Sequence, residues 1–256
     1  MLPTDAPAAA DGLRWTIAVD LAQGGADYTA VAVLETQTSP GAGRSPWPPA
    51  ERPANGHGLR PEHRVVALER WRDARTARVP ERVAAIVQRL RSRQAERDLA
   101  RHGRAPVTRP DISILVDRTG VGPYGLDPLR QAGLSPIGIL IHGGDATTRD
   151  ALGWRVPKRD LAGAVAVTLQ ARRLKVLEAL PLAETLRVEL ASFHPKINLA
   201  TGHDSYGADG PWREGRHDDL VLATAMGVWY GERDGGTIEF NPPVLVNAMS
   251  RLLEPR

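Results

Sequence analysis

The 256-residue chain contains no cysteine. Disulfide bonds and metal sites built from thiolates are therefore excluded. Any metal ion would have to be held by carboxylates or histidines, and carboxylates suit hard ions such as Mg²⁺ or Mn²⁺ best. The absence of cysteine thus narrows the metal chemistry open to the chain without deciding whether a metal binds.

Long apolar runs are also missing. No run approaches the roughly 18 residues needed to cross a bilayer, so we expect no membrane association. The opening segment, MLPTDAPAAADG, has neither the basic start nor the apolar stretch of a signal peptide. Residues 1–13 are therefore predicted to be a disordered tail.

Lysine is scarce, because only Lys158, Lys175 and Lys196 contribute to the 33 basic residues. The positive charge is carried almost entirely by arginine, and the sequence pI is about 9.6 with a net charge of +3. Guanidinium groups bind phosphate in a bidentate manner, which favours a polyanionic partner. GC-rich coding sequence also enriches arginine, alanine, glycine and proline, and both explanations stay open.

The hydrophobic pattern predicts an α/β protein with a mixed five-stranded sheet and helices on both faces. An antiparallel set of strands comes first, followed by an alternation of strands and helices that indicates parallel pairing. The predicted strands are residues 14–22, 28–35, 63–71, 111–117 and 135–144. The predicted helices are residues 80–102, a short helix within 118–133, 157–176, 180–193 and 217–233, and residues 196–210 are expected to form a polar hairpin or loop.

A single domain is predicted over residues 14–233. It is interrupted by an insertion at residues 37–62 that is rich in proline, glycine and serine, a composition typical of a long mobile connection. Residues 234–256 form a weakly patterned C-terminal tail.

Carboxylates stand at the ends of three apolar segments. Asp20 ends the first strand and Asp117 ends the fourth, where ligands of parallel sheets usually bind. Asp218 and Asp219 open the last helix, and Asp219 lies one turn before the apolar stripe of that helix. We therefore expect these carboxylates to meet at one edge of the sheet.

Such carboxylates would repel each other by several kcal/mol in a low-dielectric pocket. Protonation through a raised pKa is one way to relieve this repulsion, and binding of two divalent cations is the other. Each residue also has a local interpretation: Asp20 as a turn cap, Asp117 as an acceptor for backbone amides of the following turn, and Asp218 or Asp219 as a helix N-cap. Their joint placement favours a two-metal phosphoryl-transfer site formed by Asp20, Asp117 and Asp218 or Asp219.

Four segments in this order, AVDLAQGGADYTAVAVL, ILVDRTGVG, VPKRDL and HDDLVLATAMGVW, resemble the nuclease domain of the large terminase subunit of tailed phages. That domain belongs to the ribonuclease H-like superfamily, and the resemblance runs from about Trp15 to Glu232. It implies a ribonuclease H-like fold and a Mg²⁺- or Mn²⁺-dependent endonuclease that cuts double-stranded DNA during genome packaging. It also implies a location in the cytoplasm of the bacterial host of a phage or prophage.

The resemblance implies a role for each matching residue. Asp20 would bridge two metal ions, Asp117 would bind from the central strand, and Asp219 would bind from the helix with Asp218 as alternative or auxiliary ligand. Cationic side chains would contact DNA phosphate or the active site. These are Lys158, Arg118, Arg159 and Lys196, the last in a hairpin region near the DNA groove.

The sequence departs from a complete terminase in one respect. The phosphate-binding motif GxxxxGK[ST] of the packaging ATPase does not occur in it. The alternatives are an excised nuclease domain, a chain separate from its motor, or a relative with another task, and the start at Met1 favours a stand-alone gene. A separate packaging ATPase, the small terminase or the portal protein would then be expected as partners.

Two other functions fit parts of the pattern. The segments DLAQGGADYTAVAV and VDRTGVG also resemble the two phosphate loops of actin-like ATPases and sugar kinases, although those proteins have two duplicated domains. A non-catalytic DNA-binding or scaffold protein on the same fold is the second alternative, and it would need no metal.

Overall fold

The computed structural model describes residues 13–22, 27–37, 60–72, 78–103, 110–197, 204–208 and 218–233. The predictions for the N-terminal tail up to residue 12, for most of the insertion and for the C-terminal tail lie outside the described residues.

The described chain alternates strands with helices after an initial antiparallel set, as the hydrophobic pattern predicts. The strands are β1 (Leu13–Asp20), β2 (Thr29–Gln37), β3 (Glu62–Trp71), β4 (Asp111–Asp117), β5 (Pro136–His142), β6 (Thr148–Asp150), β7 (Gly153–Pro157), β8 (Leu174–Val176), β9 (Phe193–Ile197) and β10 (Asp204–Ala208). The helices are α1 (Val79–His102), α2 (Asp127–Gln131), α3 (Lys158–Gln170), α4 (Ala183–Ser192) and α5 (Asp219–Arg233), with a 3-10 helix η3 (Gly122–Leu126) before α2.

The main sheet has the strand order β6-β7-β5-β4-β1-β2-β3-β8. Strands β1, β2 and β3 pair antiparallel, whereas β4 and β5 continue from β1 in parallel. These five strands are the predicted ones, and the predicted α/β class, a mixed sheet with helices on both faces, is confirmed. The strand number is wrong: within the described residues the sheet has eight strands instead of five.

The additional strands are short and form at the two edges of the predicted sheet. The predicted helix over residues 157–176 ends at Gln170, because Arg172 adopts a left-handed conformation with φ of 54°. The chain then reverses, and β8 (Leu174–Val176) pairs with β3. Strands of three residues depend on the neighbouring strand for their hydrogen bonds, so local sequence does not reveal them.

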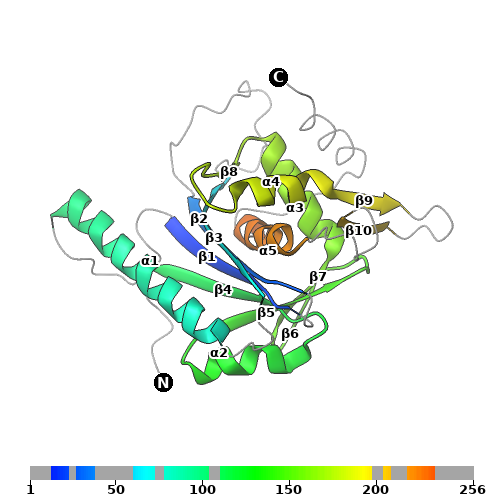
Figure 1. Cartoon of the computed structure of the whole chain (residues 1–256), viewed down its shortest axis with the longest axis horizontal. Helices are drawn as coiled ribbons and strands as arrows, with labels where there is room; N and C mark the ends of the chain where they lie inside the picture. The colour runs from blue at the N-terminus through cyan, green and yellow to red at the C-terminus, as the bar shows by residue number, and fades with distance from the viewer. Residues whose placement is uncertain are drawn as a thin grey trace, which may run out of the picture.

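Helices cover both faces of the sheet (Figure 1). One core lies under α1 and α2 and contains residues such as Ile17 and Val19 of β1. The other lies under α3, α4 and α5 and contains Ala18 of β1 and Leu115 of β4. Burying one such leucine or isoleucine stabilises the fold by about 1.5–3 kcal/mol, so the two cores fix the register of β1 between them.

The central position of α5 on the sheet depends on small residues beneath it. Ala18, Ala30 and Ala32 are fully buried on the face that α5 covers. On the helix, a Cβ added at Gly227 would lie 2.5 Å from Cδ1 of Leu34. Helix α5 therefore packs close to β1 and β2, which brings its first turn to the end of β1.

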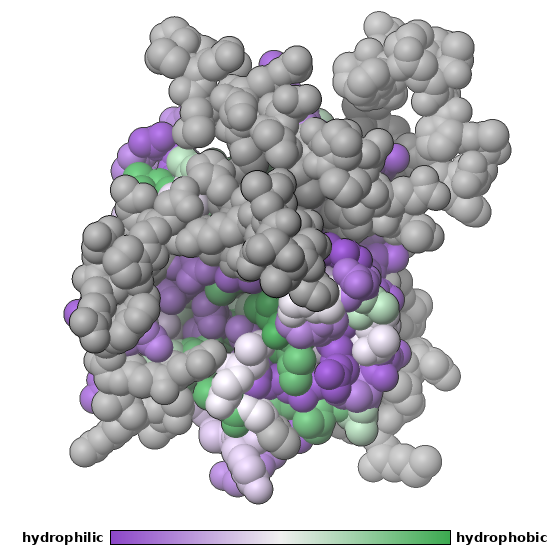
Figure 2. Space-filling model, turned by 90° about the vertical axis from the view of Figure 1, so that its right-hand side faces the viewer, coloured by the Kyte–Doolittle hydropathy of each residue, from purple (hydrophilic) through white to green (hydrophobic). Residues whose placement is uncertain are grey.

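Within the described ranges, no helix has both the length and the apolar character needed to span a membrane. Among the described residues visible in Figure 2, hydrophobic side chains lie between hydrophilic ones.

Candidate active site

Asp20 and Asp117 end the two central parallel strands of the sheet. The pairing of β1 with β4 continues up to Val19 opposite Val116, so both aspartates come one residue after the last paired position. Asp20 follows Ala18 in the alternation, and Asp117 follows Leu115, so both side chains lie on the α5 face. Both residues are buried, with 8% and 6% of their surface exposed.

The start of α5 brings two further carboxylates to this edge. Asp218 accepts the first helical hydrogen bond through its backbone oxygen, and its side chain lies 3.1 Å from Nζ of Lys158. Asp219 begins the helix, and its Oδ2 accepts a hydrogen bond of 3.1 Å from Nη2 of Arg70. Each helix carboxylate is therefore already paired with a cation.

The electrostatics show that the other three aspartates act on Asp20. Burial raises the pKa of Asp20 well above its ordinary value, and the charges of Asp117, Asp219 and Asp218 raise it further, while Lys158 lowers it. Burial also raises the pKa of Asp117, against hydrogen bonds from Thr119 that lower it. The sequence pattern predicts this electrostatic repulsion, because it places several carboxylates at one edge of the sheet.

One of the local interpretations is also observed. The backbone amide of Thr119 donates a hydrogen bond of 2.8 Å to Oδ1 of Asp117, as expected for an aspartate that precedes a turn. This contact fixes the orientation of Asp117 and uses one carboxylate oxygen.

A different residue caps helix α5. The backbone amide of Val221, in the first turn of α5, donates a hydrogen bond of 3.0 Å to Oε2 of Glu189 on α4. Glu189 is 5% exposed, and its Oε1 lies 3.2 Å from Nη1 of Arg70. Because Glu189 supplies this side-chain cap, the carboxylates of Asp218 and Asp219 remain directed to Lys158 and Arg70.

Among the cationic residues predicted to contact DNA, Lys158 pairs with a carboxylate of the candidate site, whereas Arg118 and Arg159 pair with other aspartates. Lys158 begins α3 and lies at the site through its contact with Asp218. Arg118 is buried and pairs with Asp150 of β6. Arg159 is 39% exposed and binds Asp145 at 2.6 Å, and the side chain of Lys196 lies outside the described residues.

The donor set has the right chemistry for Mg²⁺ or Mn²⁺, because it consists of carboxylate oxygens. The carboxylates also outnumber Lys158 and Arg70, the cations that contact them. However, no group of three or more His, Asp or Glu side chains in the described part of the chain is arranged to hold an ion. One carboxylate oxygen of Asp218 is paired with Lys158, and one of Asp219 is paired with Arg70.

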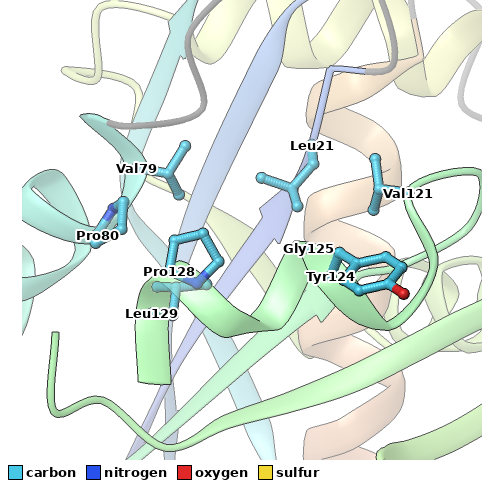
Figure 3. Close-up of a pocket in the computed structure, with 8 residues that line it drawn as sticks. All are labelled: Leu21, Val79, Pro80, Val121, Tyr124, Gly125, Pro128 and Leu129. Atoms are coloured by element: carbon cyan, nitrogen blue, oxygen red, sulfur yellow. The ribbon is translucent and has the colours of Figure 1, made fainter. Parts of the chain in front are cut away.

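An apolar hollow of about 210 Å³ lies beside this edge, between the start of α1 and the turn that follows β4 (Figure 3). Leu21, Val121, Tyr124 and Pro128 are among its lining residues. Leu21 belongs to the core under α1, on the face of the sheet opposite to that of Asp20. The hollow is therefore separate from the carboxylate site and contains none of the predicted site residues.

Sequence reasoning missed Arg70 and Glu189. A signal exists for each: Arg70 comes two residues after buried Leu68 on β3, and Glu189 comes three residues after buried Leu186 on α4. A charged residue that continues a buried face by strand or helix spacing is a candidate for an internal ion pair.

The sequence matches none of the protein-family models and none of the curated proteins with which it was compared. Among solved structures, it is similar to the large terminase from a thermophilic bacteriophage, with a TM-score of 0.42 and 15% sequence identity over 88% of this chain. The similar region covers 42% of the terminase chain, so the chain spans less than half of that protein. This similarity does not establish an activity for the chain.

Proposed function

We propose that the chain is a divalent-metal-dependent endodeoxyribonuclease that hydrolyses phosphodiester bonds of double-stranded DNA. The observation that supports this most is the delivery of Asp20 and Asp117, by adjacent parallel strands, to the point where α5 places Asp218 and Asp219. A dense group of buried carboxylates is costly unless cations offset it, and divalent cations at such a site also bind phosphate.

In this proposal the carboxylates have distinct tasks. Asp20 and Asp117 would hold the ions from the sheet, and Asp219, with Asp218 beside it, would hold them from the helix. When bound, two such ions supply a nucleophilic water at neutral pH and stabilise the departing oxygen. Thr119 keeps Asp117 oriented, and Glu189 keeps the first turn of α5 in place.

Double-stranded DNA is the proposed substrate, and Lys158 is the cation best placed to meet a phosphate near the carboxylates. Arg159 lies next to it with 39% of its side chain exposed, and Arg118 and Lys196 remain further proposed contacts. A terminase-related role in phage genome packaging inside the bacterial host would add a separate packaging ATPase, the small terminase or the portal protein as partners.

Metal binding can be tested without measuring catalysis. Millimolar Mn²⁺ or Mg²⁺ should raise the Tm of the wild type by linkage, since an ion that binds only the folded state stabilises it. Asp20→Asn should abolish this rise. In EDTA, however, Asp20→Asn should melt at a higher temperature than the wild type, because it removes an acidic group whose ionisation is opposed by burial and by the neighbouring aspartates.

Asp111→Asn is the matched control. Asp111 is exposed at the opposite end of β4 from Asp117, so its replacement should leave the metal-dependent rise unchanged. A wild type whose Tm does not respond to either ion would contradict the proposal and favour a non-catalytic DNA-binding protein. Tight ATP binding would instead favour the actin-like ATPase alternative.

A further inference from the structure

Arg70 lies in the same cross-strand row as Asp20. Asp20 on β1 stands opposite Ala30 on β2, and Ala30 stands opposite Arg70 on β3. Directly opposite residues of antiparallel strands have side chains on the same face of the sheet. Ala30 is fully buried and small, so the row holds an acid and a base on the α5 face with only a methyl group between them.

The guanidinium of Arg70 is shared between two carboxylates. Nη2 lies 3.1 Å from Oδ2 of Asp219, and Nη1 lies 3.2 Å from Oε1 of Glu189. The side chains of Arg70, Glu189 and Asp219 are 12%, 5% and 14% exposed. Arg70 therefore neutralises one predicted ligand and one residue outside the ligand set at the same time.

Further contacts hold Arg70 in this position. Its guanidinium carbon lies 3.9 Å from the centre of the Tyr28 ring, and that of Arg72 lies 4.3 Å from the same ring. The Nε of Arg70 is buried without a hydrogen-bond partner among the described residues. Such a placement costs free energy, which the two carboxylate contacts offset.

We propose that Arg70 is a positioning residue that serves as the internal counter-ion of Asp219 and is displaced from it when a divalent cation binds. This inference rests on the proposed function. The guanidinium at Oδ2 of Asp219 weakens the attraction of this carboxylate for an ion, since the two cations repel each other.

Glu189 allows this exchange without disturbing the helix. It binds Arg70 through Oε1 and the backbone amide of Val221 through Oε2, so it can retain Arg70 while it continues to cap α5. Arginine stays charged at any pH the protein tolerates, so the exchange depends on the ion and not on protonation of Arg70.

The pairing can be tested first in EDTA by a double-mutant cycle. Arg70→Gln should lower the Tm by about 2–6 °C in the wild type, because two buried carboxylates lose their counter-ion. In the Asp219→Asn background, Arg70→Gln should lower the Tm by clearly less. Equal losses in the two backgrounds would overturn the pairing on which the proposal depends.

The exchange is tested by calorimetric titration with Mn²⁺. Arg70→Gln should bind Mn²⁺ about tenfold more tightly than the wild type, since the ion no longer competes with a guanidinium for Asp219. Arg70→Lys, which keeps the charge, should restore wild-type affinity. Arg72→Gln is the matched control, because Arg72 stacks on the same Tyr28 ring, and it should leave the affinity unchanged.

The outcomes separate this inference from the proposed function. If the wild type binds Mn²⁺ and Arg70→Gln binds it equally or more weakly, Arg70 is not a competing counter-ion, although the metal site stands. If neither protein binds Mn²⁺, both proposals are overturned. Binding by Arg70→Gln alone would overturn the displacement of Arg70 by an ion, and a metal-dependent activity of the wild type with it.

Discussion

At the scale of single residues, the site consists of charges in places that the fold makes costly. Asp20 is buried near three other aspartates, which raise its pKa together with its burial. Asp219 and Asp218 are relieved by Arg70 and Lys158. Because replacing a buried ion pair by apolar groups is often neutral or stabilising, stability alone does not explain this arrangement. The proposed metal-dependent function would use these charges.

The buried carboxyl of Glu189 predicts a pH dependence of stability. Burial raises its pKa from 4.5 to about 7, against the lowering effects of the Val221 amide and Arg70. The pKa of Glu189 is higher in the folded state than in the unfolded state. Its contribution to the free energy of unfolding is therefore fully present below the unfolded-state pKa and is lost as the pH rises through the folded-state pKa. The free energy of unfolding of the wild type relative to Glu189→Gln should therefore fall by up to about 3 kcal/mol between about pH 5 and about pH 8.

Urea unfolding in EDTA at several pH values measures this difference. Glu184→Gln is the control on the same helix, because Glu184 is exposed and its hydrogen bonds to Arg187 lower its pKa. The difference in the free energy of unfolding between Glu184→Gln and the wild type should not change over this pH range. A difference between wild type and Glu189→Gln that is constant with pH would contradict the account of Glu189.

At the scale of elements, α5 links the site to the far end of the sheet. Near its C-terminus, Glu232 binds Nε2 of His63 at 2.8 Å, and Nδ1 of His63 lies 2.9 Å from the hydroxyl of Thr36. Arg173 pairs with the same glutamate. Both ends of α5 are therefore tied by buried polar contacts, which fixes where its first turn meets β1.

Close packing of α5 predicts that Gly231→Ala is destabilising. A Cβ at Gly231 would lie 2.6 Å from Cε1 of His63, whose two ring nitrogens are both held by hydrogen bonds. Although alanine favours helices, the clash should lower the free energy of unfolding by about 1–3 kcal/mol. Urea denaturation measures this change. Gly143→Ala, where a Cβ meets nothing within 4 Å, is the control, and equal stability of the two variants would contradict the described packing.

The helices and strands around the candidate site could be predicted from sequence patterns. The side-chain contacts within the site were harder to predict. The meeting of four aspartates at one edge of the sheet could be predicted, because Asp20 and Asp117 each end an apolar strand and Asp218 and Asp219 open an apolar helix. Arg70 and Glu189 were not found, since their roles depend on the packing of β3 and α4 around α5. The strand at Leu174–Val176 was missed because the reversal at Arg172 contains neither glycine nor proline.

At the scale of the whole molecule, the chain has a net charge of +3 although its candidate site is rich in carboxylates. Attraction of DNA would then come from arginine-rich surface, and cleavage from the metal-loaded carboxylates. Binding to duplex DNA should fall at least about tenfold between roughly 50 and 200 mM salt and show little preference among sequences. Fluorescence anisotropy with two unrelated duplexes measures both properties, and sequence-selective binding that ignores salt would contradict this view.

The central claim is that the four aspartates cut DNA with the help of divalent ions. The most direct measurement is incubation of supercoiled plasmid with wild type, Asp20→Asn and Asp111→Asn, with Mn²⁺ or EDTA and with or without ATP. The account predicts nicking by the wild type and Asp111→Asn only with Mn²⁺, no need for ATP, and at least about a hundredfold loss in Asp20→Asn. An intact plasmid in every reaction, or Asp20→Asn cutting at the wild-type rate, would contradict it.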